Sequence, residues 1–211
     1  MRSQQLPTER FYQQHVITVA KTLLGRRLYR RSRAGLTAGR IVETEAYLSE
    51  GDSASHTFKG PSRRNRSMFG AAGCAYVYTI HARQCVNVVT ESAGIGSAVL
   101  IRAVEPLQGI DLMQRRRGTD VLRDLCRGPA RLCEAFDIGT AFDGWNLMLG
   151  RRLWIAEADD SALPEVVASP RIGVTSATNL CYRFFLSGSP YVSGPRSLNS
   201  AQAPGPDSSR R

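Results

Sequence analysis

Metal-binding and disulfide patterns are missing from this 211-residue sequence. Its three histidines lie far apart, and its five cysteines form no Cys-x-x-Cys pair. An odd number of cysteines without such spacing indicates neither a zinc site nor a disulfide framework. The sequence therefore predicts no metal site, and it predicts small, buried thiols in a reducing compartment.

Long apolar runs are also missing. No stretch approaches the roughly 20 apolar residues that a membrane-spanning helix needs. The first five residues lead into polar sequence rather than into the apolar core of a signal peptide. No internal repeat divides the chain, and neither a heptad pattern nor an apolar surplus requires self-association. We therefore expect a soluble cytoplasmic monomer without a membrane partner.

Lysine is rare, although the chain is strongly basic. Lys21 and Lys59 are the only lysines among 28 basic residues, and the formal net charge is +10. Arginine offers a planar fork that suits phosphates and base edges. Composition bias with scattered, solvated charge is the alternative explanation. Arginines gather within residues 26–33, 63–66 and 115–117, and this clustering favours a nucleic-acid-binding surface.

The hydrophobic pattern predicts one domain over residues 10–193, with a flexible start (1–9) and a polar, disordered tail (194–211). Residues 48–66 form a long polar loop of the kind that is commonly functional. We expect a helix over residues 11–24 that ends at Gly25, with further helices at 110–117 and 128–136. The predicted strands are 26–31, 35–47, 75–80, 85–90, 97–104, 154–156, 171–174 and 183–186.

The most informative pattern lies in residues 40–47. Read as a strand, this segment places Glu43, Glu45 and Tyr47 on one face and apolar or small residues on the other. His56 and an arginine-rich loop follow within about twenty residues. Two carboxylates beside an aromatic ring and a basic loop suit acid/base chemistry on a flat substrate that is linked to a polyanion, such as a base in a nucleic acid.

With these residues in place, the sequence resembles the alkyladenine (3-methyladenine) DNA glycosylase family. The similarity runs in order from Phe11 to about Ser193, so it covers nearly the whole chain. The block that ends at Tyr47, together with the block around Arg102, is highly specific for this family. The matching blocks are 23–25, 39–47, His56, 64–69, 76–78, 87–88, 100–106, 128–132, 171–173, 183–185 and 188–193.

The resemblance implies a mixed α/β (α+β) single domain. Its core would be a curved antiparallel sheet with surrounding helices and a protruding hairpin that inserts into the DNA minor groove. It also implies an enzyme of base excision repair that flips damaged purines out of duplex DNA and hydrolyses their N-glycosidic bond without a cofactor. The lesions would be alkylated purines, with etheno and deaminated purines as further candidates. Such an enzyme would act in the cytoplasm, associated with the nucleoid.

Three residues match the family's catalytic positions. Glu45 matches the general base that activates water, Arg102 an arginine that helps to hold this water, and Ile172 a position whose backbone carbonyl contacts it. Glu43 lies on the same face and is the competing carboxylate, but the family register favours Glu45. A structural salt bridge, with Glu105 as the partner, is the alternative role for Arg102.

Other residues match the base pocket and the DNA-binding surface. Tyr47 and Tyr78 match its two aromatic walls, which favour positively charged alkylated purines through the negative face of the ring. His56 would lie near the base edge, and Asn87 would contact purine substituents. The phosphate contacts would come from Arg64 and Arg66.

The hairpin tip departs from the family pattern. Residues 79–84 are one residue short and lack the tyrosine that wedges into the gap left by the flipped base. An apolar or planar wedge is physically sufficient. We favour His81 in this role, with Ile80 and Arg83 as alternatives, and we expect Arg83 to contact DNA.

The favoured hypothesis is a monofunctional glycosylase, because neither lysine falls at a matched catalytic position where it could form a Schiff base. Two other hypotheses stay open. One is a nucleic-acid-binding module that has lost activity, supported by the short hairpin. The other is a metal-dependent nuclease that uses Glu43, Glu45 and Asp52.

Overall fold

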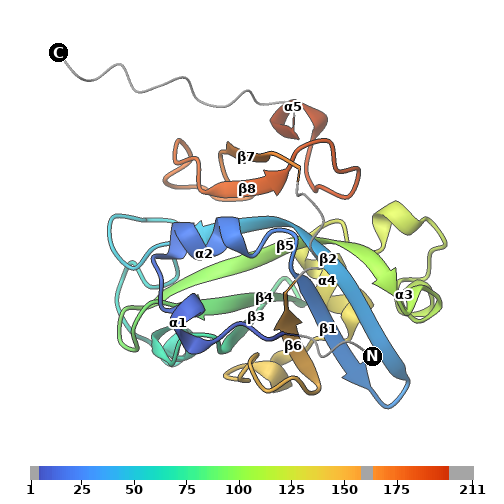
Figure 1. Cartoon of the computed structure of the whole chain (residues 1–211). Helices are drawn as coiled ribbons and strands as arrows, with labels where there is room; N and C mark the ends of the chain where they lie inside the picture. Colours follow the sequence, from blue (N-terminus) through green and yellow to red (C-terminus); the bar gives the residue numbers. More distant parts are fainter. Residues whose placement is uncertain (1–4, 158–163, 200–211) are drawn as a thin grey trace.

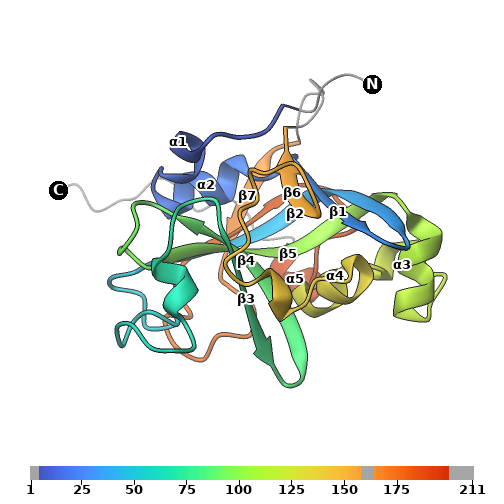
Figure 2. The ribbon, with the colours of Figure 1, turned by 90° about the horizontal axis from the view of Figure 1, so that it is seen from below.

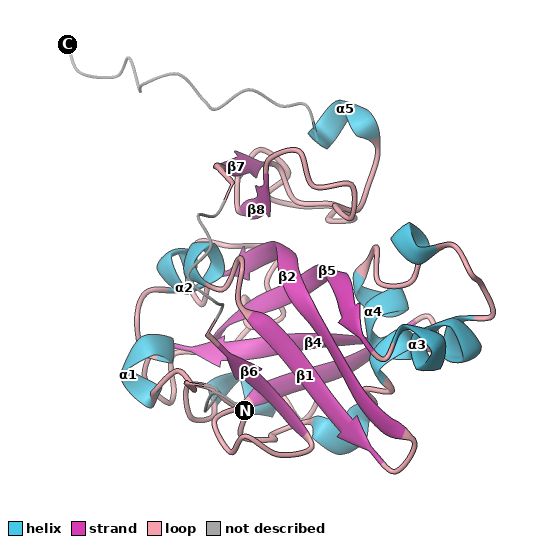
Figure 3. Ribbon diagram, turned by 45° about the vertical axis from the view of Figure 1, so that its right-hand side comes forward, coloured by secondary structure: helices cyan, strands magenta, loops and turns pink. Residues whose placement is uncertain are grey.

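An eight-stranded antiparallel sheet forms the centre of the structure, a computed structural model that describes residues 5–157 and 164–199. The sheet curls strongly, as Figures 1 and 3 show. Its main path has the order β3-β4-β5-β2-β1-β6, and β8 joins β2 and β7 beside this path. The strands are β1 (Arg27–Ser32), β2 (Gly35–Tyr47), β3 (Ala75–Ile80), β4 (Arg83–Thr90), β5 (Ser97–Gln108), β6 (Leu153–Ala156), β7 (Val166–Ser169) and β8 (Arg183–Leu186).

Short helices surround this sheet, with α1 and α2 on one side and α3 and α4 on the other in the view of Figure 2. They are α1 (Glu9–Tyr12), α2 (Val16–Thr22), α3 (Ile110–Arg117), α4 (Pro129–Phe136) and α5 (Arg196–Asn199), with 3₁₀ turns η1 (Arg66–Phe69), η2 (Leu122–Asp124) and η3 (Thr140–Phe142). Helix α2 contacts β2, β5 and β8, whereas α4 contacts β4 and β5. None of the helices in the described part of the chain is long and apolar enough to cross a membrane.

Strand β2 changes its neighbour halfway along, and this change creates the place for polar chemistry. Its first half pairs with β1, and residues Glu43, Thr44 and Glu45 pair with β8, while β5 follows its other edge. Register shifts occur on both sides of Glu43, and such bulges bend a strand and redirect its side chains. The predicted alternation is confirmed, because Val42 and Ala46 enter the hydrophobic core opposite the two glutamates.

The predicted fold class is confirmed, but some element bounds were wrong. The helix expected over residues 11–24 is two helices, because the ring of His15 accepts a hydrogen bond from the Ile17 amide and starts α2 there. Gly25 does not end this helix. It lies in a turn with φ +84°, and its amide donates a hydrogen bond to the Ile41 carbonyl.

Residues 171–174 form no strand. The strand in this region is β7, and the amide of Ile172 bonds to a side chain instead of a neighbouring strand. Strand β5 continues past Glu105 to Gln108, because Pro106 is accommodated opposite Gly39.

The hairpin turn is tighter than expected. Strand β4 begins at Arg83, so only His81 and Ala82 connect it to β3, and both have positive φ (47° and 60°). This pattern is typical of a two-residue type I′ turn. At the C-terminal end of the domain, α5 occupies the start of the expected tail, and residues 200–211 and 1–4 lie outside the described residues.

A close approach of β2 to β5 makes Gly39 sensitive to substitution. A Cβ atom at this position would clash with Val104 Cγ1 and lie 2.5 Å from the backbone oxygen of Glu105. We expect Gly39→Ala to lower the free energy of unfolding by about 1–3 kcal/mol, because the packed strands must separate. Urea unfolding measures this change. Gly139→Ala is the matched control, since its φ is negative and nothing lies within 4 Å; an equal loss in both variants would contradict the expectation.

Candidate active site

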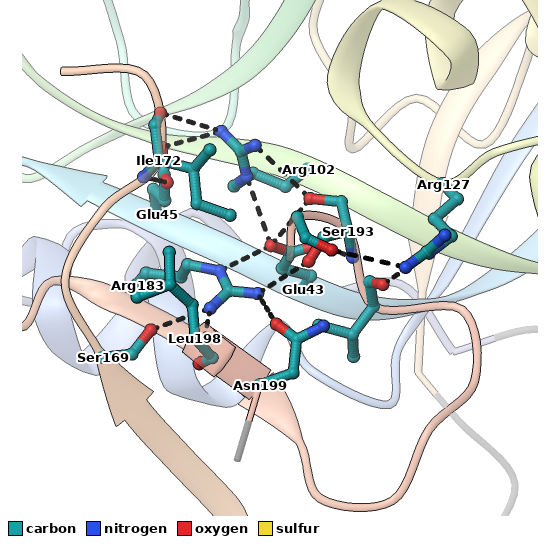
Figure 4. A network of polar contacts seen from close by, with 12 residues as sticks. Glu43, Glu45, Arg102, Arg127, Ser169, Ile172, Arg183, Ser193, Leu198 and Asn199 are labelled. Carbon is teal, nitrogen blue, oxygen red and sulfur yellow. Dashed lines mark hydrogen bonds and ion pairs between the residues drawn. The ribbon is translucent and has the colours of Figure 1, made fainter. Parts of the chain in front are cut away.

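Glu45 carries a fully buried carboxylate, which Figure 4 shows beside Ile172 and Arg102. Its Oε2 accepts a hydrogen bond from the Tyr47 hydroxyl at 2.8 Å, and its Oε1 accepts one from the Ile172 amide at 2.8 Å. Arg102 Nη1 lies 3.2 Å from Oε2. A carboxylate has about four acceptor positions, so these three donors leave room for one more, such as a water molecule.

Arg102 lies between two carboxylates. Besides its contact with Glu45, its Nε donates to Glu43 Oε1 at 3.2 Å and its Nη1 donates to the Ile172 carbonyl at 3.5 Å. Burial disfavours the charged form, but the carboxylates of Glu45 and Glu43 outweigh it and raise the pKa of Arg102. The alternative pairing with Glu105 is wrong, because Glu105 pairs with Arg40 Nε at 2.7 Å.

The second carboxylate, Glu43, is fully buried and receives four donors. Arg102 provides one, Arg183 Nε donates at 2.6 Å, and Ser193 donates both its amide (2.7 Å) and its hydroxyl (3.0 Å). Arg183 also donates to Asn199 Oδ1 at 2.7 Å, and the contacts of Ser193 and Asn199 tie the C-terminal segment to Glu43 (Figure 4). Because Glu43 has more donors than Glu45, it is less able to accept a hydrogen bond from water.

A pocket of about 320 Å³ is lined by four aromatic or imidazole rings, whereas Glu45, Arg102 and Ile172 are not among its lining residues. Tyr76 and Tyr78 stack at 5.4 Å, and His56 meets Tyr78 edge-on at 4.6 Å. Tyr47 contributes the ring whose hydroxyl reaches Glu45. The structure therefore brings together the four residues Tyr47, His56, Tyr78 and Asn87, which the sequence places up to 40 positions apart.

Tyr76 is a pocket residue that the sequence analysis did not assign. Its side chain is 1% exposed, its hydroxyl lies 2.9 Å from His56 Nδ1, and its carbonyl accepts a hydrogen bond from Asn87 Nδ2 at 3.0 Å. The signal was present in the sequence, since the Tyr-x-Tyr alternation of β3 places Tyr76 and Tyr78 on one face.

Exposed basic side chains lie on the segments that adjoin the pocket-lining residues Met68, Tyr78 and Ile80. Arg64 Nη2 donates to the Thr79 carbonyl of β3 at 3.0 Å, so the loop before η1 is tied to the hairpin. Arg66 starts η1, and His81 and Arg83 lie at or beside the hairpin turn; all three are exposed. Ile80 is 43% exposed and lines the pocket itself.

The other arginine clusters lie elsewhere. A second concavity, of about 790 Å³, lies at the β1–β2 turn. It brings together arginines from residues 26–33 and 115–117, which are far apart in the sequence. Arg30 is buried there and pairs with Asp137 at 2.9 Å. Its arginines are Arg30, Arg31, Arg33, Arg116 and Arg152.

The three carboxylates proposed for a metal-dependent nuclease do not form a shared set. Asp52 binds Arg171 through both oxygens at 2.6 and 2.7 Å, whereas Glu43 and Glu45 bind Arg102. Within the described ranges, no group of three or more His, Cys, Asp or Glu residues is arranged to hold a metal ion. Arginine contacts therefore occupy oxygens that a metal would need.

The site thus combines a buried glutamate that is held by an arginine with a pocket lined by aromatic rings. The family model for methylpurine-DNA glycosylase (MPG) matches residues 10–190, so this chain belongs to that family. The family hydrolyses N-glycosidic bonds of DNA, which confirms the resemblance and the expected enzyme class in DNA repair.

Several curated relatives cover most of the chain, and each carries the name "Putative 3-methyladenine DNA glycosylase". The relative from Methanoculleus marisnigri is 50% identical over 87% of this chain and 96% of its own length. Those from Mesorhizobium japonicum and Chlorobaculum tepidum are 47% and 45% identical, over 85% and 87% of this chain and 86% and 88% of their own lengths.

The ionisation of His56 offers a test of the pocket geometry. Burial, and then the positive charge of Arg64, lower the pKa of His56 below its ordinary value of 6.5. We expect Arg64→Gln to raise this pKa but to leave it below 6.5, because burial is the larger cause. An NMR titration of the imidazole measures it, and with only three histidines His56→Gln assigns the signal.

The sign of the linked stability follows from the same shift. Below pH 6.5 the unfolded chain binds this proton more readily, so the contribution of His56 to stability falls as the pH drops. A pKa that stayed the same in Arg64→Gln would show that Arg64 does not act on the ring.

Proposed function

We propose that this chain is a monofunctional glycosylase that flips alkylated purines out of duplex DNA and hydrolyses their N-glycosidic bond with water activated by Glu45. The observation that carries the proposal is the arrangement of Glu45. Tyr47, Ile172 and Arg102 fix its carboxylate, and one acceptor position remains for a water molecule. Tyr47 also lines a pocket of about 320 Å³.

The pocket suits a flat, positively charged ring. Burial, and then the negative charge of Glu45, raise the pKa of Tyr47, and burial raises the pKa of Tyr76 to about 12. These tyrosines therefore remain neutral at physiological pH and present the negative faces of their rings. Alkylated purines such as 3-methyladenine and 7-methylguanine carry a positive charge, whereas etheno and deaminated purines would gain stacking alone.

The chemistry balances without a cofactor. A water proton moves to Glu45, the water oxygen bonds to the sugar C1′, and the electrons of the broken N-glycosidic bond go to the base. A cationic purine leaves as a neutral molecule. The carboxylate of Glu45 also stabilises positive charge that develops on the sugar, and the product is an intact strand with an abasic site.

Strand cleavage is not expected, because neither lysine is among the donors of Glu45 or the residues that line the pocket. Lys21 lies in α2 with its Nζ 5.2 Å from the centre of the Phe184 ring, and Lys59 is exposed in the loop before η1. Neither lines the pocket. A Schiff base with the sugar therefore lacks a nearby amine.

DNA contacts follow the exposed basic side chains on the segments that adjoin the pocket-lining residues. Arg64, Arg66 and Arg83 would bind phosphates, and His81 at the tight turn would occupy the gap that the flipped base leaves. The pocket-lining Ile80 is the alternative wedge.

The central test is base release by Glu45→Gln. We expect single-turnover release from duplexes with 3-methyladenine analogues, ethenoadenine or hypoxanthine to fall by about 10²–10⁴-fold or more, because general base catalysis is lost. Glu50→Gln is the matched control, since this glutamate is exposed, and it should release base at the native rate.

The same assay separates the other two hypotheses. Native enzyme that binds DNA tightly but releases no base would indicate a binding module. Strand breaks that a chelator prevents would indicate the nuclease.

Phosphate binding by Arg66 is tested through salt dependence. We expect Arg66→Gln to weaken binding to undamaged and damaged duplexes equally and to reduce the slope of log K against log salt by about 0.9. Fluorescence anisotropy at several salt concentrations measures the slope. Arg10→Gln, an exposed arginine on α1, removes the same charge elsewhere; equal effects of both substitutions would speak against a phosphate contact at Arg66.

A further inference from the structure

One buried ion pair stands at the base of two loops that form walls of the pocket. Residues 53–56 line the pocket and follow directly after Asp52, and residues 173–176 line it shortly after Arg171. The two partners are 119 positions apart. Their contact therefore fixes the start of one pocket wall relative to the start of the other.

The pair is tightly built. Arg171 donates to both oxygens of Asp52, at 2.6 and 2.7 Å, and neither side chain is exposed. Asp52 also accepts hydrogen bonds from the backbone amides of Leu48 and Ala54. Arg171 Nη1 donates another to the Ala46 carbonyl at 3.0 Å. All four acceptor positions of Asp52 are thus used, and the end of β2 is included in the same cluster.

Stability alone does not explain this arrangement. Arg171 Nε is buried without a hydrogen-bond partner, and an unsatisfied donor is costly. Burying two charges is costly as well, and apolar residues of similar volume commonly serve a fold equally well or better. The position of the pair, rather than its energy, is the feature that requires a functional explanation.

The pair reaches Glu45 by two routes. The Arg171 guanidinium lies over the Tyr47 ring, 4.7 Å from its centre, and the hydroxyl of this ring donates to Glu45. The residue after Arg171 is Ile172, whose amide donates to the other oxygen of Glu45. Two of the three donors that hold Glu45, Tyr47 and Ile172, are therefore in contact with Arg171 or next to it in the chain.

We propose that Asp52 and Arg171 are positioning residues whose ion pair sets the separation of the two pocket walls and holds Tyr47 and Ile172 against Glu45. The proposal rests on the proposed function of Glu45. Neither Asp52 nor Arg171 lines the pocket, so neither would contact the purine. Their loss lets both walls shift, and misplacement by about 1 Å costs on the order of 10²-fold in rate.

The test is a double-mutant cycle of Asp52→Asn, Arg171→Gln and the two together. Single-turnover base release at saturating enzyme should fall by about 10²-fold in each single variant, while the Kd for an undamaged duplex stays within about twofold of native. The double variant should be no slower than the worse single variant, because both substitutions break one interaction. The fluorescence of an ethenoadenine lesion, which reports stacking in the pocket, should change in parallel with the rate.

Asp137→Asn is the matched control, since it removes the carboxylate that pairs with buried Arg30 outside the pocket. It should leave base release and lesion fluorescence unchanged. All rates are measured well below the Tm of each variant. If Asp52→Asn does not fold, Arg171→Lys replaces it, because lysine keeps the charge but cannot form the planar fork. The positioning role then predicts slower base release by Arg171→Lys at a nearly native Kd for the undamaged duplex.

The outcomes are distinct. Native release rates in Asp52→Asn and Arg171→Gln, with Glu45→Gln inactive, would overturn the positioning role and leave the proposed function standing. Loss of rate, duplex binding and Tm in proportion would show a merely structural pair and would also overturn it. A native enzyme that releases no base from any lesion would overturn the proposed function, and the positioning role with it.

Discussion

Burial of Glu43 and Glu45 side by side is the constraint on which the rest of this structure depends. Both side chains are fully buried and point to the same face of β2. Two carboxylates removed from water repel each other and require cations and hydrogen-bond donors. Arg102 lies between them and contacts both. The bulges of β2, its change of neighbour from β1 to β8 and the return of the chain at Ser193 bring the remaining donors to the same place.

The paired charges and the pocket lining involve different residues. The formal charges are paired beneath the pocket, whereas its lining consists of tyrosines, hydroxyl and amide side chains, small or apolar residues and His56. Burial and Arg64 favour the neutral form of this histidine. Under the proposed function, a base in the pocket would meet π-faces and hydrogen-bonding groups, whereas Glu45, which is not among the lining residues, would contact the water. One part of the site would then select the substrate and another would perform the chemistry.

Part of this site could be predicted from local sequence. The period-two alternation of β2 placed Glu43, Glu45 and Tyr47 on one face, whereas the family resemblance assigned Tyr78 to the pocket. Local patterns gave wrong secondary structure where tertiary or side-chain contacts determine the backbone conformation. The periodicity of residues 11–24 runs through the break that the His15 ring makes, and the β-branched residues of segment 171–174 resemble a strand although their backbone serves Glu45. The partner of Asp52 is 119 positions away, and no spacing rule on one sequence identifies such a pair.

The contacts of the C-terminal segment also bear on how the protein comes to be active during its synthesis. Ser193 supplies two of the four donors of Glu43, and Asn199 holds Arg183, which supplies another. A chain that stopped before Ser193 would leave Glu43 with only its two arginine donors, although the pocket-lining residues would all be present. The hydrogen bonds of Glu43 are thus completed by residues that are synthesised late, and a prematurely terminated product would have the pocket-lining residues without the full set of donors for Glu43.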